Sequence, residues 1–377
     1  MENNSITKTY YVNGPVNIMR LTKDNKIIYI FGDVHNNKQS QIPCPPNIDS
    51  IDIDDLLLKI FEKNKDVNFN LFCETYISNN NLKSDKKFYI DNINNLIYIE
   101  KIFKIVIDNV NYDDKNSLIP SKKYKNVKFH WFDIRKVQEK SIRYYNSIFN
   151  NIVNHYTFPY SRPIMLHIIA IIKIFMLDYN KIILNLNSNK YIKKLLGNYK
   201  NNNLKKIIND LYNKYVINTL NKINLLCNEI LLYYNDNKKK FNNNLISYEE
   251  KIDLCKKIHI NLININELYG VFYCSIADLF ILRRILDKDY IDNSIIYCGS
   301  FHMFEIAYYL IKYFNFKVTN VSYSANIKES DNIGKINHIL NNIKYDDANS
   351  IEFLNNYLVN DFTEQCSNLF TFPDDLL

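Results

Sequence analysis

The sequence predicts an α/β fold: a mixed, largely parallel central sheet flanked by helices and interrupted by an inserted helical subdomain. Four apolar runs have the length and the β-branched or aromatic content of buried strands, without alternating polar residues. Such runs are typical of strands covered on both faces. Helix-like segments separate them, as in βαβ units. Between about residues 137 and 268 helical periodicity replaces the strand signals, which predicts the insertion.

The N-terminal half of the chain predicts a strand-rich opening followed by βαβα connectivity. Lys8–Val12 and Val16–Leu21 are strand-like, and a turn at residues 23–26 joins the second of them to the apolar run Ile27–Phe31. Acidic residues around Asp52 are typical of the start of a helix, which we expect to end near Phe61. The strand-like runs Phe69–Cys73 and Phe129–Phe132 follow, with a helical stretch near residues 96–108 between them.

Sheet-forming segments return after the insertion. A helix over residues 275–286 is expected before the run Ile295–Cys298, a helix over 304–314 after it, and a strand over 316–323. We therefore divide the chain into two halves of one α/β core, a helical insertion and a C-terminal tail. These four parts are residues 1–136, 269–345, 137–268 and 346–377, the tail being the last.

Composition limits the classes of partner. The many Asn, Lys, Ile, Tyr and Phe residues are those of AT-rich codons, so the net charge of +7 is weak evidence for nucleic-acid binding, and no RNA-binding or arginine-rich motif supports it. We expect no specific nucleic-acid partner. The most apolar window, Ile164–Leu177, contains His167 and Lys173 and is too short to span a bilayer. The sequence indicates no oligomeric state.

The seven cysteines favour a reducing compartment. They are scattered without a Cys-x-x-Cys pair, which argues against a zinc ribbon and against a disulfide framework. The N-terminus lacks the basic and apolar regions of a signal peptide. We therefore expect a cytoplasmic protein, and an AT-rich genome of a large DNA virus would place it in the host cytoplasm or in the virus particle.

Each of the four apolar runs ends in a residue that can do chemistry. His35 follows the first, Glu74 the second, Asp133 the third and His302 the fourth. Two of these ends are Gly-x-x-His segments, whereas random placement of 6 Gly and 7 His would give only about 0.1 such pairs. Since ligands bind outside the carboxyl ends of strands in α/β sheets, the four side chains are expected to converge if the strands are neighbours.

Two imidazoles and a carboxylate form a plausible set for catalysis with or without a metal. In the metal-dependent version His35, Glu74 and His302 bind one divalent transition ion such as Mn, Co or Zn, and Asp33 acts as base or orients a ligand. In the metal-free version His35 is the general base, oriented by Asp33 or Glu74, and His302 or a backbone donor stabilises the oxyanion.

Polar residues beside these motifs are candidates for substrate binding. Ser300 lies within the second Gly-x-x-His segment and is a candidate. Asp133 and Arg135 form either a structural ion pair or a clamp for the substrate. Residues on the helix upstream of the last motif are expected to form a buried ion pair, namely Asp278, Arg283 and Arg284.

The ordered motifs resemble the superfamily of TIKI, TraB, ChaN-like and erythromycin-esterase-like proteins. The resemblance rests on Phe31–Asn37, on Leu71–Glu74 and on Tyr297–His302 followed by an apolar helix, with Asp33 where that superfamily often has glutamate. It implies an α/β fold with a site at the strand ends and, in some members, metal-dependent hydrolysis of peptides, histidine-based hydrolysis of a lactone, or haem binding. It therefore implies a small-molecule or peptide substrate.

Two other functions stay open. Gly32-Asp33-Val34-His35 is also similar to the first motif of calcineurin-like metallophosphoesterases, but the further Gly-Asp and Gly-Asn-His motifs of their two-metal site do not occur in this sequence. The second alternative is a non-catalytic structural or interaction protein that keeps the fold with a vestigial site. The primary hypothesis is a hydrolase that acts on an ester, lactone or peptide bond.

Overall fold

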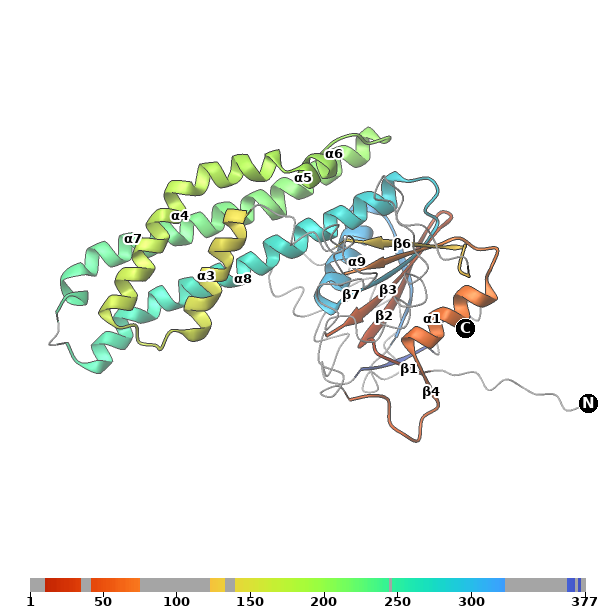
Figure 1. The fold of residues 1–377 in the computed structure, drawn as a ribbon, viewed down its shortest axis with the longest axis horizontal. Coiled ribbons are helices and arrows are strands. Elements are labelled where there is room, and N and C mark those ends of the chain that lie inside the picture. Colours follow the sequence, from red (N-terminus) through yellow and green to blue (C-terminus); the bar gives the residue numbers. More distant parts are fainter. Residues whose placement is uncertain are drawn as a thin grey trace, which may run out of the picture. The chain divides into compact units, whose positions relative to one another are not determined.

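The structure is a computed structural model, and the chain forms two compact units, residues 1–133 with 284–377 and residues 134–283 (Figure 1). The structure describes residues 11–34, 42–74, 123–132, 140–243, 246–322, 365–369 and 372–373. The first unit contains the sheets and the second is helical. The helical unit, residues 134–283, thus extends further at its C-terminal end than the insertion predicted over residues 137–268.

A six-stranded sheet forms the first unit, in the order β6-β5-β7-β3-β2-β8. This confirms the predicted α/β class with a mixed, largely parallel sheet. The parallel strands are β6, β5, β7 and β3, and β2 is antiparallel to both of its neighbours. The bounds are Asn17–Lys23 (β2), Lys26–Asp33 (β3), Phe69–Cys73 (β5), Val127–Trp131 (β6), Asn293–Gly299 (β7) and Lys317–Val321 (β8).

The predicted opening hairpin is present between β2 and β3, and its turn contains Asp24 with a positive φ of 51°. The first strand-like segment takes a different position. Its described part, β1 (Tyr11–Asn13), joins β4 (Ser50–Asp52) and β9 (Cys366–Asn368) in a separate three-stranded sheet in the order β4-β1-β9. The C-terminal tail is therefore tied to the N-terminal half of the chain through β9.

Helices α1 (Ile53–Lys63) and α9 (Ser300–Phe314) cover opposite faces of the six-stranded sheet (Figure 1). The apolar side of α1 packs in one core cluster with Tyr29 and Phe31 of β3. Since successive strand residues point to opposite faces, Gly32 faces the other way, and a Cβ there would lie 2.7 Å from the sulfur of Met303 in α9. Glycine at position 32 is thus explained by the close approach of α9 to β3.

Polar side chains cap the starts of three helices in the helical unit. Asn189 and Asn201 accept backbone N–H groups at the starts of α5 and α6, and Ser247 with Glu250 forms a reciprocal capping box at the start of α8. The helices are α3 (Lys140–His155), α4 (Arg162–Ser188), α5 (Lys190–Leu196), α6 (Asn202–Leu211), α7 (Asn218–Phe241) and α8 (Tyr248–Asp287), with a π-helical segment at Tyr212–Ile217.

Helix α8 corrects one sequence expectation. The separate helix predicted over residues 275–286 is the last part of a continuous 40-residue helix. This helix is long and apolar enough to cross a bilayer, but 67% of its most apolar window is buried inside the structure. Burial of that kind is typical of the central helix of a soluble helical bundle, and it is consistent with the expectation of no transmembrane segment.

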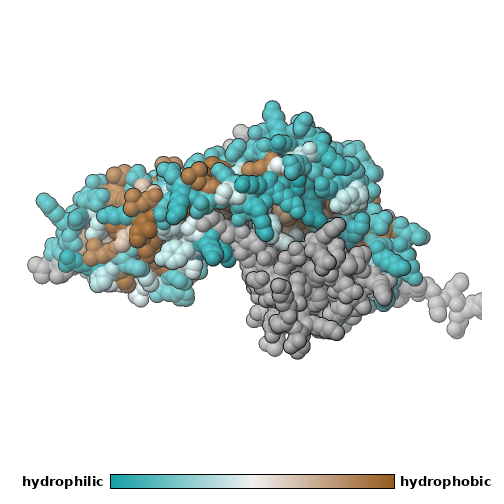
Figure 2. Space-filling view, turned by 45° about the horizontal axis from the view of Figure 1, so that its top comes forward, coloured by the Kyte–Doolittle hydropathy of each residue, from teal (hydrophilic) through white to brown (hydrophobic). Residues whose placement is uncertain are grey.

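Apolar side chains also lie on the surface of the helical unit (Figure 2). Leu177 and Leu184 of α4 are 84% and 70% exposed, and Leu225 of α7 is 60% exposed. Apolar residues therefore occur on both the buried and the exposed sides of these helices, so hydrophobic periodicity defines their buried faces only weakly.

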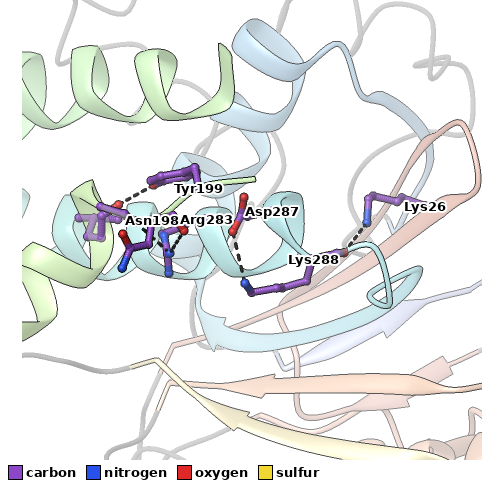
Figure 3. A network of polar contacts seen from close by, with 8 residues as sticks. Lys26, Asn198, Tyr199, Arg283, Asp287 and Lys288 are labelled. Carbon is purple, nitrogen blue, oxygen red and sulfur yellow. Dashed lines mark hydrogen bonds and ion pairs between the residues drawn. The ribbon is translucent and has the colours of Figure 1, made fainter. Parts of the chain in front are cut away.

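The expectation of a buried ion pair is wrong for Arg283. Its Nη2 atom donates to the carbonyl oxygens of Gly197 (3.1 Å) and Asn198 (3.2 Å), and its guanidinium lies 4.8 Å from the ring centroid of Tyr199 (Figure 3). These carbonyls belong to the C-cap residue of α5 and to the residue after it. A cation satisfies them because a helix C-terminus leaves carbonyl groups without intrahelical donors.

The cysteine expectation is also wrong at one place. Cys44 and Cys366 form a disulfide that joins residues 322 positions apart, with their Cα atoms 4.8 Å apart. The other five cysteines, at 73, 227, 255, 274 and 298, are not part of a disulfide. Spacing along the chain gave no sign of this pair, because it is formed only when β9 reaches the small sheet.

Candidate functional site

The carboxyl ends of four adjacent strands meet at one edge of the sheet. Residue pairing aligns Asp33 of β3 with Gly299 of β7, and Cys73 of β5 with Tyr297 of β7 and Trp131 of β6. The chain leaving β5 continues to β6 on one side, whereas α9 leads from β7 to β8 on the other. The edge between β5 and β7 is therefore a topological switch point, where α/β proteins bind ligands.

Glu74 and His302 meet at this switch point. His302 Nε2 lies 3.3 Å from Glu74 Oε1, and both residues are buried, at 3% and 4% exposed. Glu74 continues the β5–β7 ladder, because its N–H donates to the carbonyl oxygen of Tyr297. His302 lies in the first turn of α9. Two of the predicted residues, separated by 228 positions (302 − 74), are thus brought together.

The first turn of α9 adds a second feature to this pair. Glu74 Oε2 accepts the N–H of Gly299, the N-cap residue, at 2.7 Å. A carboxylate at this position is stabilised by the N-terminal end of the helix dipole. Ser300, predicted to bind substrate, is the first residue of α9 and is 8% exposed.

Aromatic side chains pack beside Glu74 and His302. The rings of Phe132 and His302 are in edge-to-face contact, with centroids 6.2 Å apart. His130 stacks on Phe72 at 4.5 Å, and its Nε2 lies 3.0 Å from Asn70 Oδ1. Burial, with the nearby charges of Arg284 and Lys128, lowers the pKa of His130 to about 3. His130 is therefore neutral at physiological pH, in agreement with a structural role.

Asp33 lies at the same edge but points to the opposite face of the sheet. Its position in β3 has the parity of Phe31, which packs toward α1, whereas Glu74 has the opposite parity to Cys73, which also packs in that cluster. Tyr297 Oη donates to Asp33 Oδ2 at 2.7 Å, and Gln365 Nε2 donates to Asp33 Oδ1 at 2.9 Å. Neither Tyr297 nor Gln365 carries a sequence motif that predicts this contact.

Three predicted residues cannot be placed. His35, Asp133 and Arg135 lie outside the described residues. Cys73, beside the site, is completely buried, and this burial raises the pKa of its thiol well above the usual value. Cys73 is therefore suited to the role of a small core residue.

The described residues supply two of the three donors proposed for a metal ion. Glu74 and His302 are carboxylate and imidazole ligands of the types that Mn, Co and Zn accept. Among the residues that the structure describes, the one group of three or more potential ligands close together is Asp52, Asp54 and Asp55 at the start of α1. A third donor beside Glu74 and His302 would come from His35 in the metal hypothesis.

A cavity of about 370 Å³ lies in the helical unit. The residues that line it include the buried Tyr160, Met165 and Cys255 and the more exposed Arg162 and Lys251. Tyr160 Oη lies 2.7 Å from His259 Nδ1. This cavity contains none of the residues that the sequence singled out for catalysis or metal binding.

Comparison with known proteins gives the family of this α/β chain. A family model described as a family of unknown function (DUF5847) matches residues 10–193 and 184–377. The chain therefore belongs to this family. No solved structure matches it.

The relatives come from Acanthamoeba polyphaga mimivirus. The uncharacterized protein R706 is 28% identical, with 97% of this chain and 96% of the relative covered. The uncharacterized protein R161 is 29% identical over 96% of this chain and 97% of its own length. R160, also described as uncharacterized, is 26% identical over 99% of this chain and all of its own length. These matches support the expectation of a viral relationship.

Proposed function

We propose that the protein is a hydrolase whose reaction takes place at the Glu74–His302 pair and cleaves an ester, lactone or peptide bond. The observation that carries the proposal is the 3.3 Å separation of these two side chains, from different strand ends, at the switch point of the sheet. The resemblance of the motifs to the TIKI, TraB, ChaN-like and erythromycin-esterase-like superfamily supports the same reaction class.

The geometry suggests how the pair would work. A carboxylate that accepts the Nε2–H of an imidazole fixes the tautomer of the ring and stabilises its protonated form. His302 would then take a proton from water as the water attacks the carbonyl carbon of the substrate, and would return it to the leaving group. The Gly299 N–H holds Glu74 in place throughout.

The start of α9 is suited to stabilise the oxyanion. The first N–H groups of a helix have no intrahelical acceptor, and the N-terminal end of the dipole favours negative charge. Ser300 and the residue after it belong to this turn. We propose that their backbone N–H groups, rather than a charged side chain, bind the oxygen that becomes negative in the transition state.

A divalent metal is compatible with the donor types of the site. Glu74 and His302 would hold it together with His35, and it would lower the pKa of a water molecule and polarise the carbonyl. Haem, which some members of the superfamily that the motifs resemble bind, is a second ligand to test. We place the reaction in the host cytoplasm or in the virus particle, with a small molecule or a peptide as substrate.

The test is a hydrolysis assay on the full chain and on two variants. The assay uses aryl esters, a lactone and a peptide, each with EDTA or with added Mn²⁺ or Zn²⁺. We expect His302→Ala to lower kcat/KM by about 10²- to 10⁴-fold. His155→Ala removes an exposed histidine of the helical unit and is expected to have no effect.

Each outcome has a defined meaning. Equal turnover by the folded His302→Ala variant would refute the catalytic role of the pair. A folded protein that hydrolyses none of these substrates would favour the structural or interaction protein, and hydrolysis of an aryl phosphate with Mn²⁺ would favour the phosphoesterase. Elemental analysis of the purified protein and a Soret absorption scan test the metal and haem arms separately.

A further inference from the structure

The Cys44–Cys366 disulfide fastens a very short strand. β9 has three residues and pairs with β1 in antiparallel register, so that Cys366 lies opposite Asn13. Asn13 also receives the backbone N–H of Cys44 on its side-chain oxygen, at 2.9 Å. Both halves of the disulfide therefore meet at the end of β1. A strand of three residues makes few ladder hydrogen bonds, so the covalent link is a major constraint on its position.

The residue next to the disulfide contacts the end of β3. Gln365 is fully buried, and its side-chain amide donates to Asp33 Oδ1 at 2.9 Å. Its backbone N–H donates to the carbonyl of Ile42 at 2.9 Å, and its carbonyl accepts the N–H of Gly14 at 3.1 Å. One residue therefore connects the disulfide to a buried carboxylate at the edge of the sheet that carries the candidate site.

A third contact holds the same strand. Ser367 is fully buried, and its hydroxyl donates to the carbonyl oxygen of Pro15 at 2.9 Å. Pro15 belongs to the connection between β1 and β2. The segment from Gln365 to Ser367 thus links the small sheet to the end of β3 and to the connection into β2, in an environment shielded from water.

We propose that the Cys44–Cys366 disulfide is a redox latch that holds β9 and Gln365 against Asp33, and that its reduction by a dithiol releases β9 from the small sheet. The release removes the Gln365 amide from Asp33 and loosens the carboxyl end of β3. That end lies directly beside Gly299, whose N–H holds Glu74. The latch is independent of the proposed function, and only its effect on turnover rests on that function.

The chemistry of the latch is a thiol–disulfide exchange. One thiolate of the dithiol attacks Sγ of Cys44 or Cys366, forms a mixed disulfide and expels the other cysteine as a thiol. The second thiol of the reductant then displaces the remaining cysteine. The protein gains two electrons and two protons, and the reductant becomes a cyclic disulfide. A disulfide donor drives the reverse reaction.

Burial controls access to the latch. Cys44 is 6% and Cys366 is 4% exposed, so a reductant reaches the sulfur atoms only when β9 opens locally. The reduced cysteines within the large sheet are poor competitors for the reductant, since Cys73 and Cys298 are fully buried. The structure therefore favours exchange at a single pair.

The experiment combines mass spectrometry with backbone hydrogen exchange on the full chain. The protein is purified without reductant, exposed to air oxidation, and treated with or without dithiothreitol before alkylation. We expect Cys44 and Cys366 to be alkylated only after dithiothreitol. Amides of residues 365–368 are expected to exchange at least tenfold faster in the reduced protein, with α4 and α7 unchanged. The variant Cys44→Ser/Cys366→Ser should show the fast exchange without reductant, and Cys274→Ser should behave as wild type.

A variant at Gln365 tests the link to Asp33. Gln365→Glu places a second carboxylate against Asp33, so we expect faster exchange at residues 31–33 even with the disulfide intact, whereas Gln365→Met keeps the size without the charge and should have the smaller effect. The proposal is overturned if both cysteines are alkylated in the oxidised protein, or if oxidised and reduced proteins exchange at the same rate. Both results are read without any enzymatic activity, so a failed hydrolysis assay leaves them valid.

Discussion

Replacing Glu74 should destabilise the α/β unit by an amount that the structure sets. Glu74→Ala removes the partner of a buried His302 and the acceptor of the Gly299 N–H. Loss of a buried partner costs about 3–5 kcal/mol when a charge is left behind, and an orphaned buried N–H costs about 1–3 kcal/mol. Since imidazole can become neutral, we expect a loss of about 3 kcal/mol for Glu74→Ala. Glu74→Gln keeps an acceptor for Gly299 and should lose about 1 kcal/mol.

A double-mutant cycle isolates the pair itself. Glu74→Ala, His302→Ala and the double variant are unfolded in urea, and the transition is followed by the fluorescence of Trp131, the only tryptophan. Trp131 lies in β6, beside β5, so the signal reports the unit that contains the site. We expect a coupling free energy of about 1–3 kcal/mol, against none in a cycle of Glu74 with the exposed His155. A coupling below about 0.5 kcal/mol would refute the reasoning.

Three further perturbations test the surroundings of the site. The pKa of His130 is about 3 in the folded chain and about 6.5 in the unfolded chain, so the unfolded chain binds the proton first as the pH falls. The free energy of unfolding should therefore drop by about 2 kcal/mol from pH 7 to pH 5. His130→Gln should reduce this dependence of stability on pH, and an unchanged dependence would contradict the low pKa of His130. Gly32→Ala brings a Cβ to 2.7 Å from Met303 Sδ and 3.3 Å from the Ser300 Cα, and should cost about 1–3 kcal/mol in urea unfolding, whereas Gly270→Ala, with open space around it, should not destabilise. Lys26 Nζ donates to the carbonyl of Ile285 in α8 and to those of Lys288 and Ile291, which follow this helix; Figure 3 draws the contact with Lys288. Burial lowers the pKa of Lys26. Lys26→Met should cost about 1–3 kcal/mol and lower the urea midpoint, while Lys23→Met, at the end of β2, serves as the control.

The sequence predicted the strands well because their burial leaves a direct trace. A strand covered on both faces favours apolar side chains at nearly every position, and the apolar runs of β3, β5 and β7 show this, although Asn70 interrupts the run of β5. The meeting of Glu74 and His302 followed from the same reasoning, since carboxyl ends of neighbouring parallel strands share one edge. The helical character of residues 137–268 was also predicted, but the buried faces of these helices were not, because exposed leucines such as Leu177 and Leu225 weaken the periodicity.

Other features depend on tertiary pairing and leave no local trace. Asp33 and Glu74 both end apolar runs, but the faces to which they point follow from the register of β3, β5 and β7, and a shift of one residue would exchange them. Gln365 lies in a tail without a motif. The Cys44–Cys366 pair requires β9 to reach β1, and neither cysteine has a spacing that indicates a partner.

The most direct test of the central claim is the imidazole proton of His302 in solution. In protein labelled with ¹⁵N-histidine, the account predicts a slowly exchanging Nε2–H resonance that disappears in His302→Ala. The resonance should move strongly in Glu74→Gln and stay in place in His155→Ala. A His302 resonance that exchanges rapidly with water and does not respond to Glu74→Gln would show that the two strand ends do not bring these side chains together.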